Sequence, residues 1–314
     1  MLAEFLALTL PPMLIATLAA LICALPGNFL LLRRQAMLGD AMSHVVLPGI
    51  VAAFLLTGSA AGPVMLAGAL AAAALSALMI EAIRRTTRAD PGAAMGVTFT
   101  TLFATGVLLL EVSGASAVHL DVEHALYGNL EGLIWLDGIG WAALADPAAL
   151  AGLPVELPAL AAALAAMALA FALIWRPLVI ATFDEGFAAT QGIPTRLLSA
   201  GLTGLTALAA VSAFAAVGSI LTIAMLICPP AAARLLTDSL PRQVALSLVI
   251  AAASAILGTL AAGYLPPALG LGFTVSAAGS IATLSGLFLA LAATFGPRRH
   301  APGHPAGRQS GPSA

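Results

Sequence analysis

Long apolar runs, separated by short polar breaks, dominate the pattern of this chain. Nine runs reach the length of about 20 residues that a helix needs to cross the hydrocarbon core of a bilayer. They cover, to within several residues at each end, positions 9–32, 36–57, 63–83, 92–112, 157–175, 197–214, 217–236, 243–264 and 271–294. The runs are rich in Ala and Leu and lack the alternation of membrane β-strands. The pattern predicts an all-α, polytopic transmembrane bundle of eight or nine spanning helices within residues 1–296.

The choice between eight and nine crossings depends on one pair of runs. Residues 197–214 and 217–236 are separated only by a short break near Gly218. Two separate crossings give a total of nine. One crossing followed by a broken or re-entrant helix gives eight.

Composition points to the same environment. Of the 314 residues, 61% are hydrophobic and 8% are charged, whereas soluble domains carry about 25% charged residues. So few polar residues cannot cover the surface of a soluble fold, and membrane lipid is therefore expected around the bundle. No basic stripe follows any run, which argues against nucleic acid as a partner.

The basic residues predict an orientation. All 12 are arginines, and basic residues collect on the cytoplasmic side of a membrane. If each run crosses once, every Arg falls on one side, which predicts an external N-terminus and a cytoplasmic C-terminus. The breaks at about 113–156 and 176–196 are then an external and a cytoplasmic loop, and the Pro/Gly/Ser-rich tail 297–314 is typical of disordered chain.

One ionisable pair lies inside a predicted span. Asp40 and His44, in LRRQAMLGDAMSHVVLPGI, are four residues apart and share one helical face. His44 would lie about 15 Å along the helix from Arg34, near the middle of a core of about 30 Å. Carboxylate plus imidazole suits Zn²⁺, Mn²⁺ or Fe²⁺ without selecting one of them. The alternatives are an N-cap role for Asp40 and an interhelical hydrogen bond for His44.

The predicted external loop contains a second polar cluster. The run HLDVEHALYG brings together His119, Asp121, Glu123 and His124. It is either a solvated acidic loop or a place where cations are captured or a partner docks. Trp135 and Trp141, further along the loop, suit the membrane interface.

Two further segments have patterns that suggest movement or contact. Pro229 and Pro230 interrupt a span, and transporters use broken helices at gates and ion sites. Gly218, Pro229 and Pro230 are therefore a candidate gate or helix break, with a purely structural kink as the alternative. The cytoplasmic break carries Asp184, Glu185, Gly186 and Gly192, which predict a short helix between two spans.

Three blocks resemble the permeases of zinc/manganese/iron ABC importers. FLLLRRQAMLGDAMSHVVLPGI is similar to the family's Gly-Asp-x-x-x-His helix after a basic pair, and LVIATFDEGFAATQGIPTRLL to its loop that docks on the ATPase. VGSILTIAMLICPPAAARLL is similar to the family's Gly-rich run ending in Pro-Ala-Ala-Thr-Ala, with Ala233 and Arg234 at the last two places. EHALYGNL is similar to its external His-x-x-x-Phe-Gly element, with Tyr127 in place of Phe. The external stretch GLIWLDGIGWAALADPAALAGLPVE departs from the plainest family pattern.

The resemblance implies a transport subunit of the bacterial inner membrane rather than an enzyme. It implies that Asp40 and His44 bind zinc, manganese or iron in transit, with no permanently bound cofactor. It also implies an ATPase docked at residues 184–192, an external metal-binding protein and a homodimer of permease chains. The chain has no GxxxxGK[ST] loop, so ATP hydrolysis is expected in a separate subunit.

Two other functions compete with this one. A permease for siderophores or cobalamin would handle bulky chelates and would not need an Asp/His pair in its pathway. An integral-membrane metalloenzyme would need three or more ligands and a water-activating site, and the sequence offers one convincing pair.

Overall fold

The computed structural model describes residues 4–59, 62–87, 90–112, 130–138, 140–270 and 275–296. Within these ranges all regular secondary structure is helical. Each predicted run corresponds to one long helix: α2 (Leu10–Leu32), α3 (Met37–Thr57), α4 (Gly62–Thr86), α5 (Pro91–Val112), α8 (Glu156–Phe183), α10 (Thr195–Val217), α11 (Ser219–Leu236), α12 (Leu240–Ala268) and α13 (Ala277–Phe295).

Most of these helices meet the requirements for crossing a membrane. Eight of those in the described ranges are long and apolar enough to do so. The remaining long helix, α3, has 21 residues, and its described segment Pro48–Thr57 is apolar as well. These findings confirm the predicted fold, an all-α bundle of eight or nine spanning helices.

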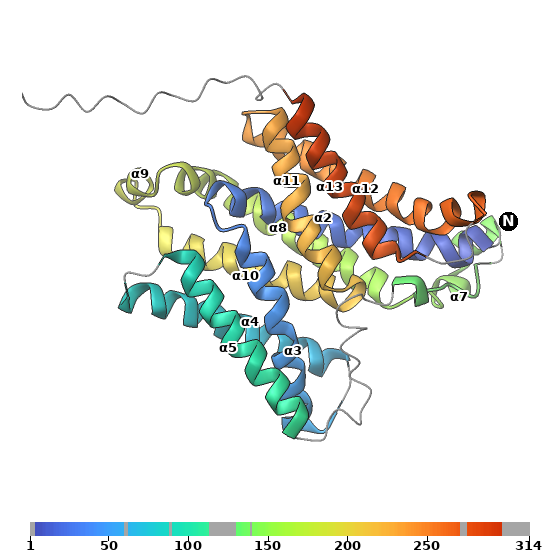
Figure 1. Ribbon diagram of the computed structural model, residues 1–314, viewed down its shortest axis with the longest axis horizontal. Coiled ribbons are helices and arrows are strands. Elements are labelled where there is room, and N and C mark those ends of the chain that lie inside the picture. Colours follow the sequence, from blue (N-terminus) through green and yellow to red (C-terminus); the bar gives the residue numbers. More distant parts are fainter. Residues whose placement is uncertain are drawn as a thin grey trace, which may run out of the picture.

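Gly218 separates the pair of runs that left the crossing number open. Its backbone, with φ 81° and ψ 175°, lies in a region that glycine alone occupies without strain. The chain therefore turns sharply there, and α10 and α11 are two distinct helices that meet at this one residue (Figure 1).

The helix α8 is longer than its apolar run. Arg176 and Pro177 suggested an end near residue 175, but α8 continues to Phe183. A single proline removes one helical donor without ending a helix whose other bonds are made, and an arginine stem can lie along apolar surface. The break expected at about 176–196 is thus mostly helical, formed by the end of α8, the short helix α9 (Glu185–Thr190) and the start of α10.

The long helices form two groups (Figure 1). One group packs α2 against α11 and α12, with α13 on α11 and α12; the other packs α3, α4 and α5 together. Helix α10 contacts α2 as well as α3 and α4, and therefore lies between the groups. Within the second group, Gly49 faces the carbonyl of Gly68, and Gly106 faces Pro48. Small residues allow such close backbone approach between helices in a membrane.

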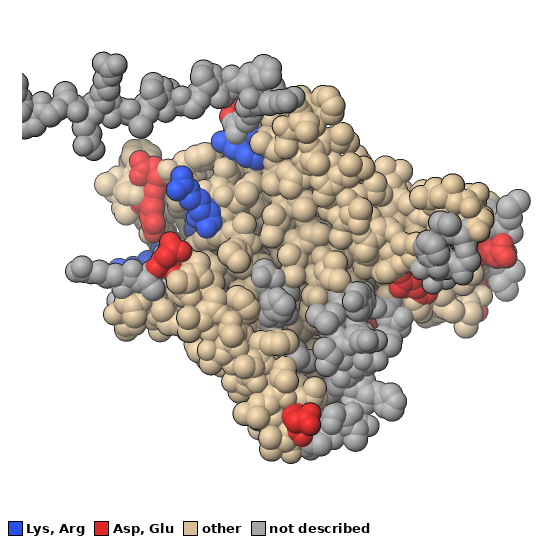
Figure 2. All heavy atoms as spheres, in the orientation of Figure 1, with Lys and Arg blue, Asp and Glu red and all other residues tan. Residues whose placement is uncertain are grey.

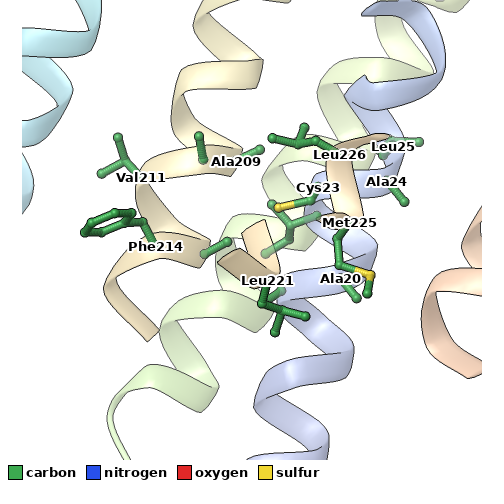
Figure 3. Close-up of a cluster of buried hydrophobic side chains, with 14 of the residues drawn as sticks. Ala20, Cys23, Ala24, Leu25, Ala209, Val211, Phe214, Leu221, Met225 and Leu226 are labelled. Atoms are coloured by element: carbon green, nitrogen blue, oxygen red, sulfur yellow. The ribbon is translucent and has the colours of Figure 1, made fainter. Parts of the chain in front are cut away.

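The main core surrounds the middle of α2. Small side chains of α2, including Ala20, Cys23 and Ala24, lie beside larger ones from α11, including Leu221 and Met225 (Figure 3). Nearly every residue between Ala19 and Leu30 is buried in the protein rather than exposed to the surroundings. The α2 helix is consequently the central element of the first group.

Charge is distributed unevenly between the two ends of the molecule (Figure 2). The Arg side chains on the face shown lie towards the end of the molecule that carries α9, the ends of α2 and α8 and the junction of α11 with α12. The opposite end, near the N-terminus, shows Asp and Glu side chains but no Arg among the described residues. The uneven distribution agrees with the one-sided placement of arginines used to predict the orientation.

The described part of the long break before α8 is a folded cap rather than an open loop. It contains η3 (Leu130–Gly132), η4 (Trp141–Ala145) and α7 (Pro147–Leu150). Trp135 is fully buried: its backbone N–H donates to Ala7 at 2.8 Å and its Nε1 to the carbonyl of Ala149 at 2.7 Å. The expected interfacial position of Trp135 is therefore wrong, because the start of the chain and α7 enclose the indole; Trp141 is exposed.

Candidate functional site

The helix α3 carries the predicted metal pair close to its beginning. Its N-cap is Ala36 and it begins at Met37, so Asp40 is the fourth helical residue and His44 lies one turn further. Asp40 therefore cannot be the N-cap, and the capping alternative is wrong. His44 lies about 10 Å along the axis from the first residue of α3, because the turn at residues 33–36 separates this helix from α2. The side chains of Asp40 and His44 lie outside the described part of the structure.

The helical segment that carries the pair is enclosed by protein. Leu38, Ala41 and Val45 are each at most 3% exposed. Helix α11 of the first group, helix α10 between the groups, and α4 and α5 of the second group all contact α3. The backbone of Asp40 and His44 thus belongs to a segment that several other helices contact, and functional charges in membranes usually face such a bundle interior.

The proline-containing helix α11 packs directly against the start of α3. A Cβ added at Gly39 would lie 2.5 Å from Cδ1 of Leu226, and one at Gly27 of α2 would collide with the Leu226 carbonyl oxygen. Pro230 has no N–H, so this carbonyl lacks its usual helical donor. Helix α11 nevertheless stays helical through Pro229 and Pro230 to Leu236. The candidate break and the candidate metal helix are therefore in contact.

The predicted short helix is present as α9. The Asp184 side chain caps it by accepting a hydrogen bond of 2.8 Å from the backbone N–H of Phe187, as expected of aspartate at an N-cap. Glu185 and Gly186 form its first turn, and Gly192, with φ +74°, turns the chain towards α10. Ala188 packs with Ala181 of α8 and Leu198 of α10, so α9 is fixed to both neighbouring helices.

Exposed aromatic residues accompany α9. Phe183 is 61% exposed and Phe187 is 52% exposed, although the end of the molecule where they lie is rich in arginine. Apolar side chains presented among charges are typical of a protein contact. This arrangement makes α9 a candidate docking element.

Sequence reasoning did not single out Arg33. This residue is the C-cap of α2, and its Nε donates to the hydroxyl of Thr182 in α8 at 3.2 Å. Burial lowers the pKa of its guanidinium, and the nearby carboxylate of Glu185 opposes that shift. The basic pair before α3 was the available signal, but nothing in the sequence connects it to residues about 150 positions away.

The structure does not describe the predicted external cluster. His119, Asp121, Glu123 and His124 lie outside the described residues. Among the side chains that the structure describes, no group of three or more His, Cys, Asp or Glu could hold a metal ion. None of the five histidine side chains of the chain falls in the part searched.

Taken together, the apolar spans, the ionisable pair on α3 and the short helix at the arginine-bearing end define a multi-pass membrane transport subunit. The chain belongs to the ABC 3 transport family, which matches residues 6–139 and 154–295. Membership agrees with the predicted resemblance and with a location in the bacterial inner membrane.

Individual relatives give the same result. The chain is 40% identical to "Manganese transport system membrane protein MntD" of Bacillus subtilis, with 88% of each chain covered. It is 34% identical to "Zinc transport system membrane protein TroD" of Treponema pallidum, over 93% of this chain and 75% of that one. A solved structure, "PsaBC from Streptococcus pneumoniae in complex with Fab", matches with a TM-score of 0.73 and 26% identity over 93% of both chains.

Proposed function

We propose that the chain is the permease subunit of an ATP-driven importer for a divalent transition metal, zinc, manganese or iron. The observation that carries the proposal is the placement of Asp40 and His44 one turn apart on a segment of α3 that the bundle encloses. The manganese and zinc relatives support the class of substrate. The metal is cargo, bound in passing on its way through the bundle.

Two protein ligands suit transport better than storage. A tight structural zinc site takes about four ligands, whereas an ion in transit must also be able to leave its site. Asp40 and His44 would supply a partial shell, completed by water or by other residues of the chain. Pro229 and Pro230, which lie on the helix in contact with α3, are the candidate gate beside that shell.

The two ends of the molecule suggest where an ATPase subunit and an external metal-binding protein would bind. The helix α9, with Asp184, Glu185, Gly186 and Gly192, would fit a cleft on a separate ATPase subunit, and Phe183 and Phe187 would be buried there. An external metal-binding protein would deliver the ion at the acidic end. A second copy of the permease would complete the transporter, so that each copy has its own ATPase.

The orientation can be tested by labelling. With a cytoplasmic α9, a Glu185→Cys variant in intact cells should resist a membrane-impermeant thiol reagent, while Asp146→Cys on α7 should react. Both native cysteines lie inside long helices, Cys23 buried and Cys228 partly so, so a background variant lacking them is a simple control. Labelling of residue 185 from outside would contradict the proposed orientation.

The metal role is tested with the importer reconstituted in liposomes and supplied with Mn²⁺, Zn²⁺ and Fe²⁺ in competition. Asp40→Asn keeps the size of the side chain and removes its charge, so uptake should fall by about tenfold or more if the carboxylate binds the ion; His44→Ala should act similarly. The matched control is Asp90→Asn, because the Asp90 side chain accepts a bond from the Gly92 N–H at the start of α5 and Asn can replace it there. Normal uptake by both α3 variants would remove the pair from the mechanism.

A further inference from the structure

Arg33 lies where three functional segments meet. It caps the end of α2, and three residues separate it from the start of α3. Its side chain bonds to the last turn of α8, next to α9. In Figure 1 the turn between α2 and α3 lies beside the chain that leads into α9. Arg33 therefore links the end of α2, next to the candidate metal helix, to the end of α8, next to the candidate docking helix.

The hydrogen bond from Arg33 has a defined direction. The Thr182 hydroxyl donates its own proton to the carbonyl of Leu178 at 2.7 Å, so its oxygen is available as an acceptor for the Arg33 Nε–H at 3.2 Å. Thr182 belongs to the last turn of α8, two residues before the α9 cap at Asp184. A displacement of the end of α8 would consequently move the guanidinium or break this hydrogen bond.

The charge of the same guanidinium is also favoured by a carboxylate of α9. Glu185, in the first turn of α9, interacts favourably with the partly buried guanidinium of Arg33. A guanidinium holds several partners at once in a fixed planar geometry, unlike an ammonium group. Arg33 thus donates to Thr182, two residues before Asp184, while the carboxylate of Glu185, the residue after Asp184, favours its charged form.

The turn between α2 and α3 is suited to pass on such a displacement. Arg34 has φ +57°, a left-handed conformation that is costly for a residue with a side chain. Backbone bonds from Gln35 N–H to Leu30 at 2.8 Å and from Leu38 N–H to Gln35 at 2.9 Å close the turn tightly. No glycine lies in residues 33–36 to make this turn more flexible. Asp40 follows Arg33 by only seven residues.

We propose that Arg33 is a coupling residue, which links movement of α9 on the ATPase to the metal-binding turn of α3 through Thr182 and Glu185. This inference rests on the proposed function, because it assigns a role within the same importer. Arg33 acts on metal through α3 and is a positioning residue rather than a ligand. The variants that test it should therefore separate ATP hydrolysis from transport.

The test uses the complete importer in liposomes, with Mn²⁺ uptake and ATP hydrolysis measured in parallel and retention of the ATPase subunit checked on purification. Arg33→Met keeps an unbranched apolar stem and removes the guanidinium with its charge and donors. We expect the number of ions moved per ATP to fall about tenfold, within the range of typical coupling energies, while hydrolysis and ATPase retention stay within about twofold of wild type. Arg242→Met, an exposed arginine near the start of α12, is the matched control and should transport normally.

Further variants distinguish coupling from a merely structural clamp. Thr182→Val keeps the shape of the side chain and removes the hydroxyl, and with it the acceptor for Arg33 and the local bond to Leu178. It should lower the ion-to-ATP ratio even if Arg33→Met fails to assemble. Glu185→Gln should lower the ratio less, and the double variant with Arg33→Met should be no worse than Arg33→Met alone, because the two act through one interaction. Additive losses, or a wild-type ratio in Thr182→Val, would overturn the inference. If the wild-type importer moves none of Mn²⁺, Zn²⁺ and Fe²⁺, the proposed function itself fails, which is a separate result.

Discussion

The two helix groups differ in how much of their surface the protein itself covers. In the first group, half of the most apolar 18-residue window of α11 is buried and 39% of that of α12, although the window of the peripheral helix α13 is only 22% buried. The corresponding values in the second group are 22% for α4 and 28% for α5. Leu75 and Leu78 of α4 and Leu108 of α5 are among the exposed side chains. The first group is thus a shared core, whereas the second presents more apolar surface to lipid or to another chain.

The difference gives α3 a special position. Its first turns lie against α11 through Gly39, while Pro48 and Gly49 lie against α5 and α4. One end of this helix is therefore fixed to the well-packed group and the other end to the less enclosed one. Such a boundary suits the role proposed for α3, which is to hold the metal-binding pair while a partner moves.

The largest expected effect comes from overpacking the first group. Gly27→Ala would drive a Cβ into the Leu226 carbonyl, which is backbone and cannot move without shifting α11. We expect the free energy of unfolding to fall by about 3 kcal/mol or more, at the upper end for overpacked cores. Thermal denaturation of the detergent-solubilised protein measures it. The control is Gly204→Ala, which meets nothing within 4 Å and should be neutral or stabilising; equal behaviour of the two variants would contradict the tight contact.

Much of the first group and of the second could be predicted from the sequence. Lipid requires each span to be a long apolar helix, so nine runs predicted nine helices, and Gly218 marked the break between α10 and α11 in advance. Asp184 and the glycines that follow it predicted α9 for a similarly local reason, since capping and turning depend on neighbouring residues.

Features that depend on distant residues could not be predicted. Arg176 and Pro177 suggested a boundary, but packing carries α8 on to Phe183. Trp135 is buried because Ala7 and Ala149 accept its two N–H groups, and sequence patterns do not contain such pairings. The hydrogen-bond partner of Arg33 is 149 positions away. No local pattern in the sequence shows that α2 and α8 end side by side.

A change in the second group should affect transport more than folding. Gly106→Ala would place a Cβ 2.8 Å from Cα of Pro48, and would push α5 away from the middle of α3. We expect a loss of about 1–2 kcal/mol in stability, since both helices have exposed faces along which they can shift. Because α3 carries the metal pair, metal uptake should fall by a larger factor than the yield of folded protein. A loss of yield that fully accounts for the loss of uptake would contradict this comparison.

A smaller effect is expected from the buried polar contact between α2 and α12. Asn28 donates to the Ser247 hydroxyl at 2.7 Å and accepts from Gln243 Nε2 at 3.1 Å, and all three side chains are fully buried. Asn28→Ala leaves the Gln243 amide N–H group without this acceptor. We expect a loss of about 1 kcal/mol, the order found for interhelical hydrogen bonds in membranes. Equilibrium unfolding in mixed micelles measures it, and an unchanged midpoint would show that the contact contributes nothing.

The smallest effect is expected at Gln243 itself, although it is as deeply buried as Asn28. Its Oε1 is a buried acceptor with no hydrogen-bond partner among the described residues, so burying this side chain already carries a desolvation cost. Gln243→Met keeps the length of the side chain and removes both the unpaired acceptor and the bond to Asn28. Because a buried polar group without a partner costs about as much as a hydrogen bond contributes, the two changes should nearly cancel. We expect the free energy of unfolding to stay within about 0.5 kcal/mol of wild type, well short of the loss expected for Asn28→Ala in the same assay. A loss of stability in Gln243→Met as large as that in Asn28→Ala would contradict this expectation. It would mean that Gln243 Oε1 has a hydrogen-bond partner in the membrane, for example a buried water. The polar contact between α2 and α12 would then include more than the three side chains described.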